Sequence, residues 1–294
     1  MRTRHFLQLI FLSALWGASF PLIRIASPAF GPIGLAGFRC VLAASVLAVL
    51  MRLLGERWPA RDTWARMTVL SLLTVVSPFL LFNWAGLVLP AGYSAILNAT
   101  VPLFGILGAA AMGEERLTAR RLAGCALGFA GVALLVRLGP IELDTKVLLA
   151  ALACTAAAAS YGIGAILMKR ATLAHGPLPA SAGVHVAAAL VLLLPSAATA
   201  PAMQFTPGAV ASVAVLGMVT SGFMYWLSMR LMREIPASAA TTPAFLIPLF
   251  GVTWGGLFLG EPVTAGMLPG CVLVLGAMAL VTGFNPFRAA PPQP

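Results

Sequence analysis

The side chains best suited to bind a small molecule are a few aromatic and amide groups inside long apolar stretches. Polar groups are costly there unless they face protein or a water-filled cavity. An amide offers two donors and an acceptor, which suits the ammonium and carboxylate groups of a zwitterion. Contacts between helices are the alternative role for each group. The predicted ligand-binding residues are Trp16, Phe79, Asn83, Asn98, Tyr161, Tyr225 and Phe245.

The depth of these residues within their stretches differs. Trp16 lies about 16 Å along its stretch at 1.5 Å per residue, which is central, and Tyr161 is similarly deep. Asn83 follows Phe79 by four residues, so the two share one helix face. Tyr225 is close to the end of its stretch, where an interfacial aromatic belt is the alternative. We therefore expect Trp16, Tyr161 and the face of Phe79 and Asn83 to line a central cavity.

Two arginines and one histidine also lie within apolar stretches. Arg24 is close enough to an end to reach the lipid headgroups and is predicted to be an anchor. Arg39 is deeper and must contact carbonyls, water or a carboxylate. A structural hydrogen-bonding role is the preferred interpretation of Arg39, and binding of a substrate carboxylate is the alternative. His185 is predicted to form hydrogen bonds between helices rather than to carry protons.

Prolines inside the apolar stretches are predicted hinges or gates. A proline removes a helical hydrogen bond and loosens the helix, so it can expose carbonyls to a ligand or allow bending. Such prolines are also common in membrane helices generally. The predicted hinge residues are Pro21, Pro78, Pro102, Pro243 and Pro248.

The elements that position these residues are predicted to lie in a lipid bilayer. The 294-residue chain is 60% hydrophobic and 9% charged, whereas a soluble protein carries about 25% charged residues. Apolar runs of about 20 residues have the length of a spanning helix. The expected class is an all-α integral membrane protein with ten transmembrane helices, at residues 5–26, 33–54, 67–87, 92–112, 119–136, 147–169, 178–198, 208–231, 238–259 and 265–283.

The basic residues indicate the orientation of the chain. With a cytoplasmic N-terminus, 14 of the 18 Lys and Arg residues lie on the cytoplasmic side, and only Arg137 and Lys146 lie outside. Cytoplasmic loops are enriched in basic residues, so both termini are predicted to be cytoplasmic. The net charge of +10 is spread over short loops rather than gathered on one face, so no nucleic acid partner is expected.

The chain repeats its own motifs at an offset of 146 residues, which slips to 147 at one Gly-Glu pair. Weaker echoes extend the repeat toward the N-terminus of each half. The matched motifs are Pro102-Leu103-Phe104-Gly105 with Pro248-Leu249-Phe250-Gly251, Gly113-Glu114 with Gly260-Glu261, Trp16-Gly17 with Tyr161-Gly162, and Ser77-Pro78-Phe79 with Ser221-Gly222-Phe223.

Two halves of five helices each must cross the membrane in opposite senses. Inverted repeats are typical of secondary transporters, which bind substrate near the midplane between the repeats. The expected segments are a first five-helix repeat over 1–136, a periplasmic connector over 137–146, a second inverted repeat over 147–284 and a disordered cytoplasmic tail over 285–294.

These features together resemble the drug/metabolite transporter superfamily and its ten-helix EamA-type branch. The resemblance rests on Leu15-Trp16-Gly17-Ala18-Ser19-Phe20-Pro21, on Arg39, and on the paired segments 113–118 and 260–264 with the glycine-rich helices that follow them. In length and aromatic content the chain is similar to the YddG-type amino-acid exporters. The resemblance implies a multi-pass protein of a bacterial inner membrane that exports small metabolites, often amino acids, through a cavity opening alternately to each side.

The absence of acidic residues and of basic clusters from the middle of the apolar stretches limits the mechanisms and substrates that are expected. All eight acids lie in loops or at the ends of apolar stretches, with Glu261 nearest to one. Ion-coupled carriers usually need a buried carboxylate, so transport without obligatory ion coupling is expected. The absence of a mid-membrane basic cluster argues against phosphate cargo.

The favoured prediction is a facilitative exporter of neutral and aromatic amino acids or related metabolites. An exporter of cationic drugs, with or without proton coupling, is the alternative, and an intramembrane enzyme is a remote one. No HExxH, GxSxG or paired-aspartate motif lies in the spans, so no catalytic residue, metal site or cofactor is predicted. The expected partners are a small-molecule substrate and the lipid bilayer, for a monomer or alternatively a homodimer.

Overall fold

The computed structural model describes residues 3–114, 116–138, 141–234 and 242–282. Over these ranges the chain is helical and contains no strand, which confirms the predicted all-α class. Among the described residues, six helices are long and apolar enough to cross a membrane, and shorter apolar helices cover Leu246–Leu259 and Ala265–Val281. The six are Leu7–Leu53, Arg61–Ala85, Ala91–Ala111, Thr145–His175, Pro177–Ala202 and Pro207–Leu231.

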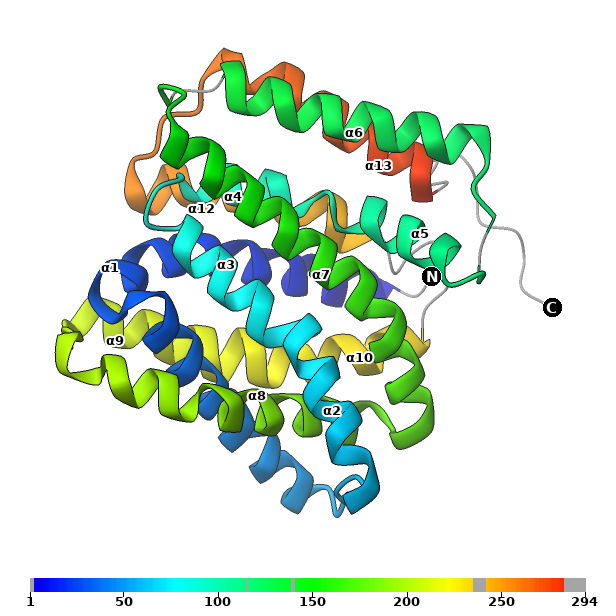
Figure 1. Cartoon of the computed structure of the whole chain (residues 1–294), viewed down its shortest axis with the longest axis vertical. Helices are drawn as coiled ribbons and strands as arrows, with labels where there is room; N and C mark the ends of the chain where they lie inside the picture. The colour runs from blue at the N-terminus through cyan, green and yellow to red at the C-terminus, as the bar shows by residue number, and fades with distance from the viewer. Residues whose placement is uncertain (1–2, 115, 139–140, 235–241, 283–294) are drawn as a thin grey trace.

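The first two predicted spans form one element, α1 (Thr3–Leu53). Its direction changes at Gly31, whose φ of 67° and ψ of 161° are not helical. A positive φ favours glycine, which has no Cβ to clash with the backbone. Figure 1 shows the blue ribbon crossing the bundle, turning back at one end and crossing again. One element therefore supplies two crossings, with Pro21 in the first and Arg39 in the second.

The third and eighth predicted spans each contain a segment of π-helix, a wide form of helix that is rare and often lies at functional sites. The third span consists of α2 (Trp64–Ser71), the π segment η2 (Leu72–Val76) and α3 (Ser77–Ala85). The eighth consists of α9 (Pro207–Ala214), the π segment η4 (Val215–Phe223) and α10 (Met224–Glu234). The offset that aligns Ser77 with Ser221 places residues 72–76 within η4, so the two π segments occupy equivalent positions.

The fourth and ninth spans share a proline motif but differ in continuity. The fourth is interrupted at residues 99–100 between α4 (Ala91–Asn98) and α5 (Val101–Ala111), and Pro102 lies in the first turn of α5. Its counterpart Pro248 lies inside the continuous α12 (Thr242–Leu259). Pro243 lies in the first turn of α12, where a proline costs no helical hydrogen bond, whereas Pro78 lies where α3 continues from η2 without a break.

The fifth and tenth spans pack side by side at one edge of the bundle (Figure 1). They are α6 (Ala119–Leu138) and α13 (Leu268–Thr282), and the 3-10 turn Ala265–Met267 precedes α13. A Cβ added at Gly131 would lie 2.9 Å from the backbone nitrogen of Val274, and one at Gly124 would lie 2.6 Å from Val281 Cγ2. Glycines thus allow the close approach of these two helices within the chain.

The remaining long helices are α7 (Thr145–His175) and α8 (Pro177–Thr199). Asp144 caps α7 by accepting a 2.7 Å hydrogen bond from the Val147 backbone nitrogen. Gly176, with a φ of 92°, turns the chain between the two helices. The second crossing of α1 packs against α8.

The two halves contact each other reciprocally. A Cβ at Gly17 would lie 2.6 Å from Phe250 Cβ, and one at Gly162 would lie 2.6 Å from the backbone nitrogen of Gly105. Gly17 and Gly162 are sequence counterparts, and so are the two Phe-Gly pairs that they contact. Such exchanged contacts are those that a two-fold axis between the halves produces.

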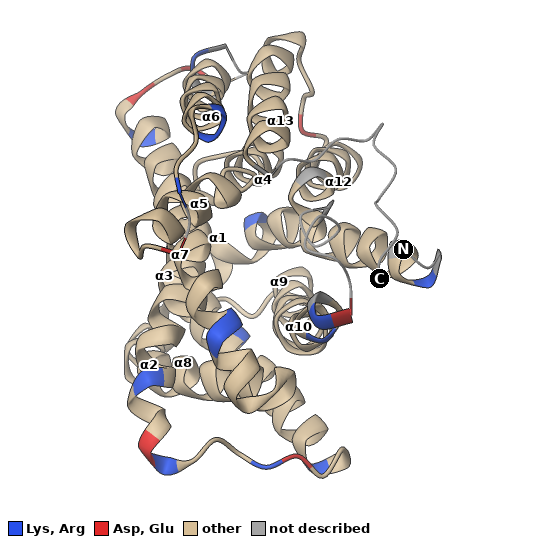
Figure 2. Cartoon of the chain, turned by 90° about the vertical axis from the view of Figure 1, so that its right-hand side faces the viewer, with Lys and Arg blue, Asp and Glu red and all other residues tan. Residues whose placement is uncertain are grey.

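The helix ends gather at two opposite faces of the bundle. α1 begins and α13 ends at the same face, on the right in Figure 1. Figure 2 looks onto that face and shows Lys and Arg at helix ends and in the connections around it. That this face meets the cytoplasm stays a prediction from the basic residues of the sequence.

Candidate functional site

Arg39 is the central residue of the candidate site. It is only 7% exposed, and its Nε donates a 2.6 Å hydrogen bond to Ser221 Oγ on η4. Its guanidinium carbon lies 3.7 Å from the centroid of the Phe79 ring on α3, a cation–π contact. In the part of the chain that the structure describes, Arg39 forms no ion pair with a carboxylate.

A glycine lets η4 come close enough for this contact. A Cβ at Gly217 would lie 2.6 Å from Leu42 Cβ and 3.1 Å from the Arg39 carbonyl oxygen. Any side chain there would push η4 away from α1. Gly217 therefore sets the short distance across which Arg39 reaches Ser221.

The same π segment also holds Trp16. The indole Nε1 of Trp16, in the first crossing of α1, donates a 3.2 Å hydrogen bond to the carbonyl oxygen of Thr220. Thr220 is the neighbour of Ser221 in the chain, so both crossings of α1 are attached to one point of η4. A π turn shifts backbone groups out of the regular helical pattern, which leaves the Thr220 carbonyl available to Trp16.

Two further predicted residues lie beside Arg39. Tyr161 on α7 interacts electrostatically with Arg39 and packs against the cluster that contains Phe79. Its ring stacks on Phe82, with centroids 6.2 Å apart. Tyr225 on α10 packs against the same hydrophobic cluster as Tyr161. Tyr225 therefore packs against other helices of the bundle, and the choice between a site role and an interfacial role for it stays a prediction.

His185 on α8 completes the group. Its Nδ1 lies 2.9 Å from the Ser181 carbonyl oxygen and so carries the proton. Its Nε2 is buried without a hydrogen-bond partner, and its ring meets that of Tyr225 edge-on, with centroids 4.8 Å apart. The prediction of a hydrogen bond between helices is wrong, since Ser181 belongs to the same helix. We refer to Trp16, Arg39, Phe79, Tyr161, His185, Ser221 and Tyr225 as the Arg39 cluster.

The arrangement can hold an anion next to aromatic rings. A guanidinium presents five N–H donors, and only Nε of Arg39 has a described hydrogen-bond partner. A carboxylate is the group that a guanidinium binds most specifically, by two parallel hydrogen bonds. Phe79, Tyr161 and Trp16 supply apolar and aromatic surface beside it.

Two predicted residues, Asn83 and Asn98, lie apart from the Arg39 cluster, and a third, Phe245, has a side chain that the structure does not describe. Asn83 is buried, and its Nδ2 donates a 3.0 Å hydrogen bond to the Pro32 carbonyl oxygen, while its Oδ1 has no partner. Asn98 ends α4, just before the break in the fourth span. The side chain of Phe245 is outside the described part of α12. Pro21 lies in α1 one turn beyond Trp16.

A second group of charges lies at the face of the bundle opposite the basic one. Arg24 Nε is 3.2 Å from Glu261 Oε1, and Arg24 Nη1 donates a 2.7 Å hydrogen bond to the Leu89 carbonyl oxygen. Glu261 also accepts hydrogen bonds from the backbone nitrogens of Ala91 (2.8 Å) and Gly92 (3.3 Å). The prediction that Arg24 is a lipid anchor is wrong, because its guanidinium is engaged inside the protein.

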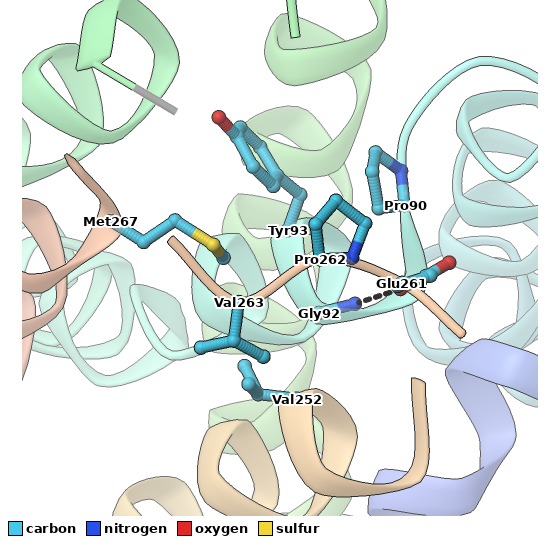
Figure 3. A pocket seen from close by; sticks show the side chains of 8 residues that line it. All are labelled: Pro90, Gly92, Tyr93, Val252, Glu261, Pro262, Val263 and Met267. Carbon is cyan, nitrogen blue, oxygen red and sulfur yellow. Dashed lines mark hydrogen bonds between the residues drawn. The ribbon is translucent and has the colours of Figure 1, made fainter. Parts of the chain in front are cut away.

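A small pocket adjoins Glu261 (Figure 3). In the figure Glu261 points toward the backbone nitrogen of Gly92, at the start of α4. Apolar side chains form most of the remaining wall, which gives the pocket little to bind a polar ligand with. The lining residues are Pro90, Gly92, Tyr93, Val252, Glu261, Pro262, Val263 and Met267.

Sequence reasoning missed Ser221 as a member of the site. A signal for Ser221 existed, since Ser77-Pro78-Phe79 and Ser221-Gly222-Phe223 match in the repeat. Ser221 contacts Arg39 and Phe79 lies under its guanidinium, so both copies of this motif contribute to the cluster.

The helical fold and its long apolar spans define an integral membrane protein. The profile of the EamA-like transporter family matches residues 5–137 and again residues 148–283. The chain belongs to this family, as the resemblance predicts. It is a multi-pass protein of a bacterial inner membrane.

Relatives and a solved structure cover almost the whole chain. The uncharacterized transporter YvbV of Bacillus subtilis is 27% identical over 95% of this chain and 92% of its own. A probable terminal-alkyne amino-acid exporter of Streptantibioticus cattleyicolor is 29% identical, over 90% and 89%. The uncharacterized inner membrane transporter YedA of Escherichia coli K12 is 27% identical, over 96% and 93%. One crystal structure shares the fold with a TM-score of 0.69 at 17% identity, over 96% and 99% of the two chains.

Proposed function

We propose that this transporter exports neutral and aromatic amino acids, or related small carboxylates, by alternating access and without obligatory ion coupling. The observation that carries the proposal is the buried guanidinium of Arg39, which has aromatic and hydroxyl neighbours but no described carboxylate partner. A buried charge is costly unless it is paired. The carboxylate of a bound substrate would provide that pair, and Phe79, Tyr161 and Trp16 would contact its side chain.

An inverted arrangement of the halves supports alternating access. The family profile matches each half separately, and Gly17 and Gly162 make reciprocal contacts with the other half's Phe-Gly pair. Equivalent π segments lie in the third and eighth spans. A two-fold relation of this kind lets one half rock against the other around a fixed site.

The acids support a mechanism without ion coupling. Of the eight acids, Glu115 is outside the described residues and six are exposed. Glu261 is partly buried, but Arg24 and two backbone N–H groups already engage it. No described acid contacts the Arg39 cluster, so protonation of a carboxylate there is not available to drive the cycle.

The positive charge of Arg39 disfavours the alternative, export of cationic drugs. The aromatic rings of the cluster can bind a cation in principle. The guanidinium already occupies the face of Phe79, however, and would repel a second cation at short range. A carboxylate-bearing substrate uses the same residues without this penalty.

The proposal is tested by exchange of labelled substrates across proteoliposomes that contain the purified protein. Amino acids, their carboxamides and a cationic dye are compared, with and without a pH or sodium gradient. Exchange of amino acids but not of carboxamides, independent of the gradients, is the expected result. Accumulation driven by a gradient would overturn the uncoupled mechanism, and exchange of the dye alone would establish the drug-export alternative.

A further inference from the structure

Two ion pairs join the halves of the molecule at opposite ends. At one end Arg24 of α1 pairs with Glu261, which follows α12. At the other end Arg170 of α7 forms a hydrogen-bonded ion pair with Glu114, which follows α5. Each pair therefore takes one residue from either half. The α12 end lies on the left in Figure 1, and the ends of α5 and α7 lie on the right.

The members of the two pairs are counterparts in the sequence repeat. Glu114 and Glu261 are 147 residues apart, the offset of their Gly-Glu motifs, and Arg24 and Arg170 are 146 apart, within one residue of the 145 offset of the nearby Trp16–Tyr161 match. Glu114 and Glu261 belong to the matched Gly-Glu motifs. A two-fold axis between the halves converts one ion pair into the other, so the chain carries the same charged contact once at each end.

The two ion pairs differ in exposure and in their additional contacts. The Arg24 and Glu261 side chains are 35% and 11% exposed, and Glu261 is also bound by the Ala91 and Gly92 nitrogens at the start of α4. The Arg170 and Glu114 side chains are 59% and 37% exposed. Exposed ion pairs contribute little, because water and salt screen them. The contact at the Glu261 end is therefore the stronger of the two.

We propose that the two ion pairs form in alternation and that each, when formed and buried, closes one end of the transport pathway. We call the Arg24–Glu261 pair the Glu261 latch and the Arg170–Glu114 pair the Glu114 latch. This inference rests on the proposed alternating access between inverted halves. In the state described here the Glu261 latch holds α1, the α12 end and α4 together, which closes the predicted external side. The weaker Glu114 latch leaves the predicted cytoplasmic side free to open. The outward-open state requires the reverse, with the Arg24–Glu261 pair broken and the Arg170–Glu114 pair, already formed but exposed here, buried between the halves.

The latches are tested by distances rather than by transport. Pairs of spin labels are placed in a background without the four native cysteines. Labels at Leu87 and Val263, both exposed, span the Glu261 end, and labels at Met112 and Leu173, also exposed, span the Glu114 end. Electron–electron dipolar measurements in lipid nanodiscs then report the separation at each end without any substrate.

Arg24→Gln is the first test variant, because it removes the ion pair but leaves both N–H bonds to Glu261 in place. The expected result is a longer and broader distance distribution between the labels at Leu87 and Val263, with a shorter one between those at Met112 and Leu173. Glu261→Gln should act in the same direction. Arg170→Gln should shift the populations the opposite way and less. Glu142→Gln, which removes an exposed acid at the same end as Glu261, should change neither distance.

Two outcomes would overturn the latches. One is unchanged distances in an Arg24→Gln protein that elutes as a single symmetric peak in size exclusion. The other is the same end opening in Arg24→Gln and Arg170→Gln. Because no substrate is present, these results are independent of cargo: shifted distances without amino-acid exchange would contradict only the proposed substrate, and exchange with unshifted distances would contradict only the latches.

Discussion

Two arginines on the same helix, Arg24 and Arg39, show how this protein treats charge in its interior. Arg24 faces a carboxylate and a carbonyl, so its charge is neutralised within the fold. Arg39 is more deeply buried, yet its described partners are a hydroxyl and an aromatic ring. A neutralised pair joins elements of the bundle, whereas an unneutralised charge is available to a ligand. Arg24 therefore stabilises the packing of the bundle, and Arg39 is the residue that the proposed function assigns to the substrate carboxylate.

The largest effect is expected from Arg39→Gln. Removing one member of a buried charge pair costs about 2–5 kcal/mol, so exchange of an amino acid should fall at least about 30-fold. Exchange of the matching carboxamide should not fall, since it has no charge for Arg39 to bind. The measurement is concentration-dependent exchange in proteoliposomes.

Arg39→Lys and Arg137→Gln sharpen this prediction. Lysine keeps the charge but loses the planar contact with Phe79 and the forked donors, so it should fall between wild type and Arg39→Gln. Arg137 is exposed, and its replacement should leave exchange unchanged. An equal loss for the amino acid and the carboxamide in Arg39→Gln would show that Arg39 has a structural role.

Trp16→Ala should have the next largest effect. It removes an aromatic wall and the hydrogen bond to Thr220, and a loss of about tenfold in exchange is expected. Trp16→Phe keeps a ring and should retain more activity. Trp254 provides a matched control, because its Nε1 donates a comparable 3.0 Å bond to the Ala14 carbonyl oxygen outside the cluster. If Trp254→Ala lowers exchange as much as Trp16→Ala, packing rather than substrate contact explains both losses.

Thermal stability should reverse the order of the two arginines. Arg24→Gln leaves Glu261 without its cation, at a cost of about 1 kcal/mol because Arg24 is partly exposed and screened. The melting temperature should then fall by about 2–4 °C. Arg39→Gln removes an unpaired buried charge and should leave the melting temperature unchanged or raise it. Scanning fluorimetry in detergent measures both, and a larger fall for Arg39→Gln would contradict the comparison.

The fold was largely predictable because lipid imposes a long apolar run on every crossing. The positions at which the regular α-helix is interrupted within a span were harder to predict. Pro102 and Pro248 are equivalent in sequence, yet only the span that contains Pro102 is interrupted. The π segments leave no mark in composition, because one extra residue per turn hardly changes an apolar pattern.

Most residues of the candidate site could be predicted individually, but the contacts between them could not. Trp16, Phe79, Tyr161 and Tyr225 were chosen because they lie within apolar runs, and the structure places them around Arg39. The partner of Arg39 is 182 residues away and that of Arg24 is 237 away. Pairings over such separations depend on tertiary packing, which the sequence does not reveal. The prediction that Arg24 reaches the lipid used only its depth within the apolar run, and it was therefore wrong.

The smallest effect is expected from Asn83→Ala, which tests where the cluster ends. Asn83 follows Phe79 by one helical turn, but its Nδ2 already binds the Pro32 carbonyl oxygen. Hydrogen bonds between membrane helices contribute about 0.6 kcal/mol on average, so exchange should fall no more than about threefold. Asn83→Leu, which keeps a similar volume but loses both amide groups without adding a charge, should behave similarly. A loss as large as that of Trp16→Ala would instead mean that the unpartnered Oδ1 contacts the substrate, and the site would then extend along α3 toward the Glu261 latch.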